Sequence, residues 1–273
     1  MNIVDQIRTG SITAPAMLSG QRQQKILELL QAQQFVRVSE LVRALGASQA
    51  SIRRDLQALE RAGLLKRTHG GAARRQTAGF ELSLAEKEDR FKAEKAAIAE
   101  VALSLVSDGD TVMLDAGSTT LQIARRLKER RNIKVVTNAV NIAWELSSSE
   151  LEVTLIGGTL RRNTLALVGP IAITTVAGLH VDKLFLATNG LDLKRGLTSP
   201  SLIEAQVKRA MLDSASEVIV VTDHSKFGRI AFSQVCSLDR VHRLITDVGA
   251  PRDFVQALER LRIDVLLAGE TRG

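Results

Sequence analysis

The sequence predicts an α/β protein with two parts, an N-terminal winged helix-turn-helix and a larger C-terminal domain built on a mostly parallel sheet. Charge is the first observation behind this prediction. The first 75 residues hold 12 Lys and Arg against 5 Asp and Glu, whereas the remaining 198 hold 25 of each sign. The second is a pair of capped helices with a basic hairpin inside the basic part, and the third is a regular alternation of apolar runs with helical segments after it.

The composition is ordinary for a soluble globular protein. The chain has 273 residues, of which 45% are hydrophobic and 25% charged, and no apolar run approaches the ~20 residues of a membrane-spanning helix. The N-terminus lacks a secretion-signal pattern, so we expect a cytoplasmic protein. Cys236 is the only cysteine and the four histidines lack metal-ligand spacing, so no disulfide, metal or cofactor is predicted. Few aromatics and no tyrosine argue against stacking on single-stranded nucleic acid.

Composition shifts and breaker residues divide the chain into four segments. We expect an N-terminal arm over residues 1–20, a winged helix-turn-helix over 21–73, a linker over 74–92 and an effector-sensing domain over 93–273. Met17 is an alternative start, because helical periodicity begins soon after it.

The basic part opens with alternating helical and β-like patterns. Ile26, Leu29 and Leu30 fall at helical spacing, and Ser39 is predicted to cap a short helix that Gly46 ends. The predicted elements are a helix over residues 21–34, a β-like run over 35–38, a helix over 39–46 and a longer helix over 48–63.

The third helix carries the residues with the strongest prediction of DNA contact. Ile52, Leu56 and Leu59 form its buried stripe, and Asp55 is expected to pair with Arg54 or another basic group. In a helix-turn-helix the start of the second motif helix enters the major groove. The predicted DNA-binding residues here are Ser48, Gln49, Ser51, Arg53 and Arg54.

A basic hairpin is predicted to follow this helix. Residues 64–68 are strand-like, and a glycine pair permits a tight turn, which together are typical of a wing that reaches phosphate or the minor groove. A solvated basic face is the alternative, but two capped helices and a hairpin in this order favour DNA. The wing residues predicted to bind DNA are Lys66, Arg67, His69 and Gly70. Arg74 and Arg75 are expected to reach the DNA backbone nearby.

This segment resembles the DeoR family of bacterial sugar-catabolism repressors. The run S-I-R-R-D-L at residues 51–56, followed by T-H-G-G-A at 68–72, is specific to that family. The resemblance implies a transcriptional repressor that binds a double-stranded DNA operator. The other matching residues are Arg22, the run at 26–30, the run at 38–41, Gly46, Ser48 and Leu59.

The larger part alternates apolar β-rich runs with helical segments, which predicts a mostly parallel sheet covered by helices on both faces. The predicted strands are residues 111–115, 134–137, 152–156, 183–187, 217–222, 241–246 and 264–267. The predicted helices are residues 93–106, 119–128, 139–146, 171–179, 202–215 and 252–261.

Polar residues collect where five of the predicted strands end, which is where such sheets bind ligands. After the first strand, a glycine, several hydroxyls and a helix start could cradle a phosphate, although the same residues are ordinary helix caps. Five polar ends around one sheet favour a pocket for a small polyhydroxylated anion. The ends are D-A-G-S-T-T at 115–120, T-N-A at 137–139, I-G-G-T-L-R-R at 156–162, T-N-G-L-D at 188–192 and V-T-D-H-S-K-F-G at 221–228.

These motifs also resemble the sensor domain of the DeoR family, which is similar in fold to ribose-5-phosphate isomerase. The resemblance implies that residues 117–120 and Lys226 hold the phosphate of a phosphorylated sugar, while Asn138, Asp192 and Glu204 face its hydroxyls or carbonyl. Two simpler roles remain, a helix-stabilising pair of Glu204 with Lys208 and a turn cap at Asp223. The predicted effector-binding residues are Asp115, Gly117, Ser118, Thr119, Thr120, Asn138, Gly158, Asp192, Glu204 and Lys226.

Catalysis is not expected in this pocket. Glu204 could act as a base, but Lys194 lacks the glycine cluster of the isomerases and Asp192 stands alone where they carry more than one acid. We therefore predict a regulator, most simply a repressor of a carbohydrate-utilisation operon, acting as a homo-oligomer (dimer or tetramer). An isomerase-like enzyme with an accessory DNA-binding head, and a structural DNA binder with an inert body, are the alternatives.

Overall fold

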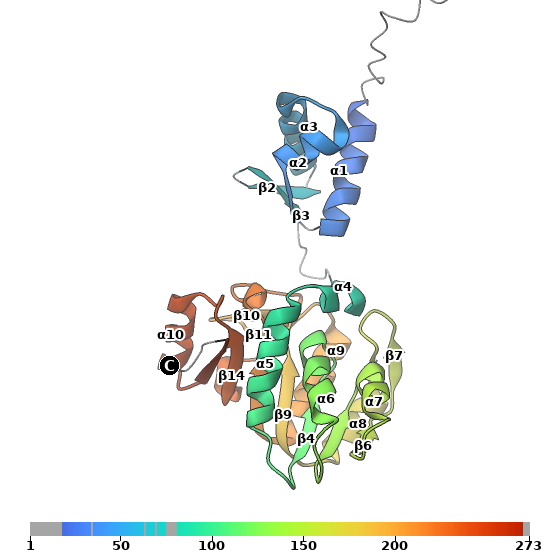
Figure 1. Ribbon diagram of the computed structural model, residues 1–273, viewed down its shortest axis with the longest axis vertical. Helices are drawn as coiled ribbons and strands as arrows, with labels where there is room; N and C mark the ends of the chain where they lie inside the picture. The colour runs from blue at the N-terminus through green and yellow to red at the C-terminus, as the bar shows by residue number, and fades with distance from the viewer. Residues whose placement is uncertain (1–17, 34, 63, 69, 75–80, 270–273) are drawn as a thin grey trace, which may run out of the picture. The chain divides into compact units, whose positions relative to one another are not determined.

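The computed structural model describes most of the chain and divides it into two compact units, residues 1–76 and 77–273 (Figure 1). Each unit has its own cluster of buried apolar side chains. No helix in the described part of the chain combines the length and hydropathy needed to cross a bilayer. The described residues are 18–33, 35–62, 64–68, 70–74 and 81–269. Residues 1–17 of the predicted arm therefore lie outside them.

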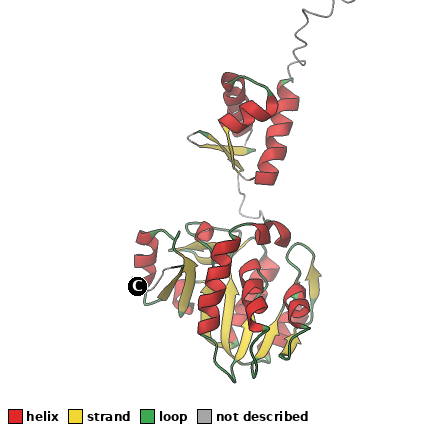
Figure 2. Cartoon of the chain, viewed as in Figure 1, coloured by secondary structure: helices red, strands yellow, loops and turns green. Residues whose placement is uncertain are grey.

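The first unit combines helices with a small antiparallel sheet of order β1-β3-β2, as Figure 2 shows. Ile26, Leu41, Ile52 and Leu56 are buried at its centre, so the apolar stripe predicted for the third helix is confirmed. Its elements are α1 (Ser19–Gln33), β1 (Phe35–Arg37), α2 (Val38–Leu45), α3 (Gln49–Arg61), β2 (Leu65–Thr68) and β3 (Gly71–Arg74). The winged helix-turn-helix is the architecture that the sequence predicts.

The start of α2 differs from the sequence prediction. The N-cap position is held by Arg37 instead of Ser39, and the helix begins at Val38. The backbone N–H of Arg37 donates to the Glu40 carboxylate at 3.0 Å, which stabilises the helix start without a hydroxyl cap. Val38 is buried in the core, and the cap lies two residues earlier than the predicted Ser39.

The hairpin of β2 and β3 requires a glycine where it meets β1. Gly71 pairs with Arg37 across the sheet, and a Cβ at this position would overlap the carbonyl oxygen of Val36. Only glycine allows this close approach of two strands. The glycine pair of the predicted wing therefore has a packing role in addition to forming the turn.

The second unit is built on a seven-stranded parallel sheet of order β15-β14-β12-β9-β4-β5-β6. Its strands are β4 (Thr111–Leu114), β5 (Lys134–Thr137), β6 (Glu152–Leu155), β9 (Val181–Ala187), β12 (Ala215–Val221), β14 (Arg243–Asp247) and β15 (Asp264–Ala268). Its α-helices are α4 (Leu84–Asp89), α5 (Lys92–Ser104), α6 (Ser118–Leu127), α7 (Val140–Leu146), α8 (Pro170–Ala177), α9 (Leu202–Asp213) and α10 (Arg252–Arg260). All seven strands predicted from the sequence are confirmed, with ends shifted by two residues or fewer.

Helices cover both faces of this sheet (Figure 1). The helices α5, α6 and α7 pack on one apolar cluster, and α8, α9 and α10 pack on the other. The strands supply alternate residues to the two faces: Leu184 and Leu186 of β9 join one cluster and Phe185 joins the other. Burial on both faces explains why these strands read as continuous apolar runs.

The strand order reverses between β4 and β9. From β4 the chain proceeds through β5 to β6 on one side, and from β9 it proceeds through β12 and β14 to β15 on the other. Such a switch point leaves a crevice at the carboxyl ends of the two strands, where open α/β sheets bind ligands.

The sequence prediction omits the smaller elements of the second unit. These are the pair β7 (Thr159–Arg161) and β8 (Ala166–Val168), and the sheet of β10 (Gly190–Asp192), β11 (Gly196–Ser199) and β13 (Ser233–Cys236). It also assigns residues 74–92 to a linker, whereas α4 lies within that range and packs against α6. The C-terminal part of the predicted linker is therefore wrong, because Leu84 is buried in the second unit.

Candidate functional site

In the first unit, a groove separates the start of α3 from the hairpin. It brings together four of the predicted DNA-binding residues, and its volume is about 510 Å³. Arg53 projects from the exposed side of α3, and no carboxylate pairs with it among the residues that the structure describes. The groove is lined by Val38, Ser39, Gln49, Arg53, Leu56, Arg67, Gly70 and Gly71.

The predicted serines shape the helix start. The Ser48 hydroxyl accepts a hydrogen bond from the Ser51 backbone N–H at 3.2 Å, so the predicted cap of α3 is confirmed. The two hydroxyls also lie 3.0 Å apart. Arg54 is exposed beside them but is not part of the groove lining.

Asp55 organises the helical face behind this groove. It is buried and accepts hydrogen bonds from Arg22, Ser19 and Gln23 of α1. Burial opposes ionisation, but these hydrogen bonds prevail and lower the pKa of Asp55. The expected basic partner is therefore Arg22 and not Arg54, and this contact fixes α3 against α1.

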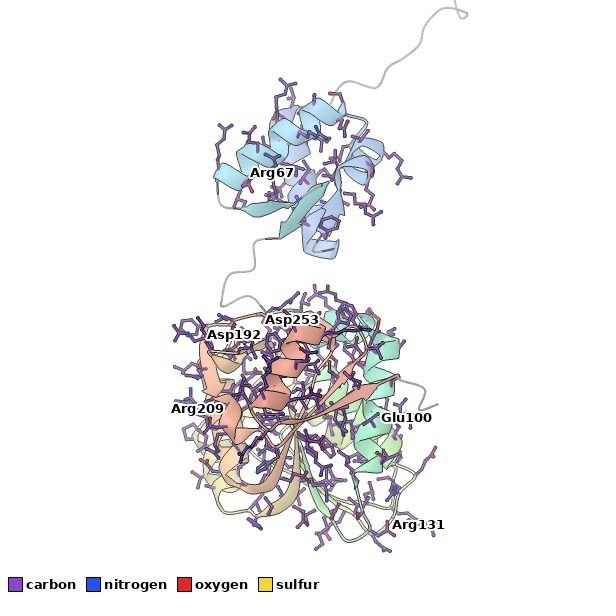
Figure 3. All side chains as sticks on the ribbon, turned by 90° about the vertical axis from the view of Figure 1, so that its left-hand side faces the viewer. Arg67, Glu100, Arg131, Asp192, Arg209 and Asp253 are labelled. Atoms are coloured by element: carbon purple, nitrogen blue, oxygen red, sulfur yellow. The ribbon has the colours of Figure 1, made fainter. Side chains whose placement is uncertain are left out.

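The wing is described in part. Arg67 lies on β2, where its backbone N–H donates to Glu60 at 2.9 Å (Figure 3). His69 lies outside the described residues, and so do the side chains of Lys66 and Arg74, although their backbones belong to β2 and β3. The predictions for these side chains stay predictions.

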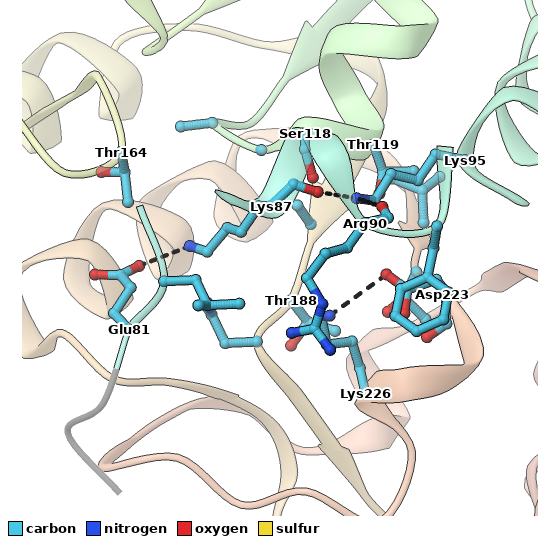
Figure 4. A pocket seen from close by; sticks show the side chains of 18 of the residues that line it. Glu81, Lys87, Arg90, Lys95, Ser118, Thr119, Thr164, Thr188, Asp223 and Lys226 are labelled. Carbon is cyan, nitrogen blue, oxygen red and sulfur yellow. Dashed lines mark hydrogen bonds and ion pairs between the residues drawn. The ribbon is translucent and has the colours of Figure 1, made fainter. Parts of the chain in front are cut away.

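In the second unit, a cavity lies at the carboxyl ends of β12, β9 and β4, which are adjacent strands at the switch point (Figure 4). Residues 81–95, here called the strap segment, supply part of its wall. The cavity is lined by Glu81, Leu82, Lys87, Arg90, Phe91, Lys95, Ala116, Gly117, Ser118, Thr119, Thr164, Ala187, Thr188, Asn189, Glu204, Lys208, Val221, Thr222, Asp223 and Lys226.

The start of α6 points backbone N–H groups at this cavity. Gly117 is its N-cap and contributes no side-chain hydrogen bond, so the first N–H groups of the helix remain for a ligand. A Cβ at Gly117 would lie 2.7 Å from the Cβ of Ala187 on β9, which explains the glycine. Ser118 and Thr119 follow it in the cavity wall. This arrangement suits an anion.

Cations gather at one end of the cavity, where Figure 4 shows Lys95 beside Thr119, and Arg90 and Lys226 close to Asp223. Lys95 is buried and donates to the carbonyl oxygens of Lys87 and Arg90. Burial lowers the pKa of Lys95 to about 8 and also lowers that of Lys226. The excess of positive charge makes this end attractive to an anionic group.

The loop after β12 presents one of these cations. Asp223 caps the short turn His224–Lys226 by accepting from the Ser225 N–H at 3.0 Å, so its predicted capping role is confirmed. Its carboxylate lies 3.4 Å from the Lys226 ammonium. The Lys226 ammonium also donates to Ser225 at 2.8 Å, which orients it toward the cavity.

Carboxylates and hydroxyls occupy the opposite end. Glu204 accepts from Thr164 at 2.6 Å and pairs with Arg161 at 2.5 Å. Arg161 also pairs with Glu81 at 3.0 Å, and Glu81 pairs with Lys87 at 3.0 Å. Carboxylates at this end are suited to accept hydrogen bonds from hydroxyl groups.

The predicted pair of Glu204 with Lys208 does not form. Lys208 instead forms an ion pair with Asp115 and donates to the carbonyl oxygen of Ala187 at 2.9 Å. Asp115 is buried, and burial raises its pKa while the Lys208 ammonium acts in the opposite direction. Asp115 therefore joins β4 to α9 beneath the cavity and does not line it.

Four other predicted effector residues lie outside the cavity lining because their polar groups serve the fold. Thr120 donates to the Gly117 carbonyl at 2.9 Å, and Asn138 accepts from the Ala116 N–H at 3.0 Å. Gly158 lies against the backbone of β8. Asp192, at the end of β10 (Figure 3), accepts from the N–H groups of Lys194 and Arg195 in a turn.

The contribution of the strap segment to the cavity was not predicted, because its charged residues resemble those of a solvated linker. One signal was available, a capping box of Ser83 with Glu86 that marks the start of α4. Thr164, which is buried, was not predicted as a cavity residue, and Thr188 and Asn189 were recognised only as part of the polar strand end at 188–192.

Both units match known proteins. The family described as the DeoR-like helix-turn-helix domain matches residues 22–78, and the DeoR C-terminal sensor domain matches residues 90–248. The HTH-type transcriptional regulator GlpR of Haloferax volcanii is 40% identical over 250 residues, which cover 92% of this chain and 98% of that protein. The transcriptional repressor AccR of Agrobacterium fabrum is 38% identical over 250 residues, covering 90% and 96% respectively.

A solved structure is also similar to part of the chain. Ribose 5-phosphate isomerase A from Methanocaldococcus jannaschii matches with a TM-score of 0.38 and 18% identity, covering 50% of this chain and 54% of that one. No group of three or more potential metal-ligating side chains occurs within the described ranges.

Proposed function

Because the chain belongs to the DeoR family of helix-turn-helix transcriptional regulators, we propose that it represses a sugar-utilisation operon under the control of a phosphorylated sugar. The cavity of the second unit is the effector site in this proposal. The first unit binds the operator through the start of α3 and the wing.

One observation carries the effector assignment: an uncapped helix start and three cations converge on one end of a cavity whose other end presents carboxylates. The phosphoryl group binds the N–H groups of α6 together with Lys95, Arg90 and Lys226. The sugar hydroxyls face Glu204 and Thr164 at the other end.

The DNA assignment is supported by the exposed groove of the first unit. Gln49 and Arg53 carry side chains that can donate to base edges in the major groove, and Arg67 reaches phosphate from the wing. A single winged helix contacts few bases, so the repressor acts as a homo-oligomer that occupies repeated half-sites.

The proposal is tested with the full chain and an operator selected from a random duplex library. Ribose-5-phosphate, fructose-1-phosphate and inorganic phosphate are screened for a shift in melting temperature and for release of the operator in a gel-shift titration. We expect a phosphorylated sugar to raise the melting temperature and to weaken operator binding by about 5- to 150-fold.

Two variants separate the effector site from the DNA site. Lys226→Ala is expected to weaken binding of the phosphorylated sugar by about 10- to 100-fold, because a charge-assisted hydrogen bond is lost. Operator affinity measured without effector should stay unchanged. Lys134→Ala, which removes an exposed lysine at the opposite end of the sheet, is the matched control. Normal induction of Lys226→Ala would contradict the effector site.

A further inference from the structure

The strap segment is the wall of the cavity nearest in sequence to the DNA-binding unit. It supplies six of the lining residues, including Glu81, Arg90 and Lys95. Only residues 75–80 separate its first residue from the end of β3 in the wing. The strap segment is therefore the part of the cavity wall that is joined to the DNA-binding unit by the shortest stretch of chain.

The cavity is too small for a phosphorylated sugar unless part of its wall moves. The space left between the lining side chains is about 50 Å³, which admits only about three to five water molecules. A pentose or hexose phosphate is far larger than this group of waters. A phosphorylated sugar that enters this enclosed space must consequently displace side chains or backbone around it.

The strap segment is the part of the cavity wall whose displacement requires the least free energy. The remaining walls come from the sheet, α6 and α9, whose apolar side chains are buried in the two core clusters. The helix α4 has only six residues, and Leu84 is its one buried side chain in the described structure. Elements with few buried apolar contacts are the first to open locally.

Polar contacts hold the first end of the strap segment. The Glu81 carboxylate pairs with Arg161 at 3.0 Å, and the Leu84 N–H donates to the carbonyl oxygen of Asn163 at 2.9 Å. Arg161 also reaches Glu204 at the cavity's acidic end. A sugar hydroxyl that engages Glu204 therefore acts on the same guanidinium that retains Glu81.

The second end of the strap segment is anchored more firmly. Phe91 adopts a left-handed conformation with φ of 53°, which is costly for an aromatic residue, and its ring packs edge-on against His224 at 4.8 Å. Lys95 fixes the carbonyl oxygens of Lys87 and Arg90 from α5. The geometry defines a lever with its fixed end at Phe91 and its releasable end at Glu81.

We propose that the strap segment is the element through which the effector changes operator affinity, and that the Arg161–Glu81 pair is the contact that holds it down. This inference rests on the proposed function. The closed strap corresponds to the effector-free state, and the effector selects a state in which Glu81 has left Arg161.

Thermodynamic linkage gives a distinctive expectation for Arg161→Met. Arg161 does not line the cavity, and its loss favours the open strap before any effector is present. The phosphorylated sugar should then bind about 10-fold more tightly, because it no longer has to break the contact. In the absence of effector, Arg161→Met should change operator affinity about 10-fold. The change should have the same direction as the change that the effector causes in the wild type.

Lys183→Met is the matched control. It removes a similarly shielded ion pair, Lys183 with Asp110 at 2.7 Å, at the amino ends of the strands and away from the strap. Glu81→Gln is the second variant, since it weakens the same contact but leaves Arg161 paired with Glu204. It should shift both affinities with the same signs and by a smaller factor.

Both affinities are measured on the full chain by calorimetry and gel shift, with the phosphorylated sugar that gives the largest melting shift in the wild type. Tighter effector binding together with altered operator binding supports the strap as coupling element. The strap assignment is overturned if Arg161→Met and Glu81→Gln behave like Lys183→Met, or if they lower the affinities for both the effector and the operator. If no phosphorylated sugar alters operator binding by the wild type, the proposed function itself is overturned.

Discussion

The two units of this chain use their cations in opposite ways. In the first unit Arg53 and Arg54 are exposed on α3, and the structure describes no carboxylate partner for either. In the second unit Lys95 and Lys208 are buried, and each donates to protein oxygen atoms. Exposed cations meet a long polyanion without prior desolvation, whereas buried cations can select one small anion because water is already excluded.

The units also differ in how their sites are assembled along the chain. The groove of the first unit comes from residues 38–71, so one short motif supplies it. The cavity of the second unit comes from residues 81–226 and depends on the order of strands in the sheet. Damage to a single buried contact should therefore affect the second unit more than loss of a single surface cation affects the first.

The largest effect is expected for Asp115→Ala. This change leaves the Lys208 ammonium buried beside the Ala187 carbonyl without its carboxylate. We expect a loss of about 3–5 kcal/mol in the free energy of unfolding, measured by urea denaturation of the full chain. The double variant Asp115→Leu with Lys208→Met should recover most of this loss. A cost under about 1 kcal/mol for the single variant would show that Lys208 is not a structural cation.

Arg53→Ala should lower operator affinity and leave stability almost unchanged, in contrast to Asp115→Ala. Operator affinity should fall by about 1–3 kcal/mol in a gel-shift titration, because a base-reading side chain is removed from α3. The free energy of unfolding should change by less than about 0.5 kcal/mol, since Arg53 is exposed. Arg61→Ala, at the other end of the same helix, is the control and should retain sequence preference. Unchanged affinity of Arg53→Ala would remove α3 from the DNA interface.

Arg67→Ala tests the wing separately from the helix. We expect binding to weaken by a similar factor for operator and unrelated DNA, because Arg67 is assigned to a phosphate. The slope of log affinity against log salt should become shallower by about one unit. A loss confined to the operator would assign Arg67 to a base instead.

The smallest effect is expected from pH. Burial lowers the pKa of Lys95 to about 8, so its ammonium is increasingly neutral as pH rises from 7 to 9. A bound phosphoryl group favours the charged form, and effector affinity should therefore fall several-fold over this range, whereas the phosphate charge stays nearly constant. Lys95→Arg should flatten the profile measured by calorimetry. An unchanged slope would exclude Lys95 from the phosphate site.

The sequence predicted the elements of both units more fully than it predicted the cavity. All seven strands of the large sheet were predictable as β-rich runs, and the five central ones are apolar and mainly buried, whereas the edge strands β6 and β15 are more exposed. Ser118, Thr119 and Lys226 were predictable as cavity residues because glycine- and hydroxyl-rich loops follow those strands. Asn138 and Asp192 belonged to similar loops, yet their side chains satisfy local backbone groups and lie outside the cavity lining.

The amino-acid sequence by itself determined where the DNA-binding motif begins and ends, because helix periodicity, caps and glycine turns act over a few neighbouring residues. Only the tertiary structure decided which polar strand ends meet, since β12, β9 and β4 become neighbours through long-range pairing that leaves no local pattern. It also decided that residues 81–95 form a cavity wall and not a tether, because the Glu81 carboxylate finds its partner Arg161 on β7, far away in sequence.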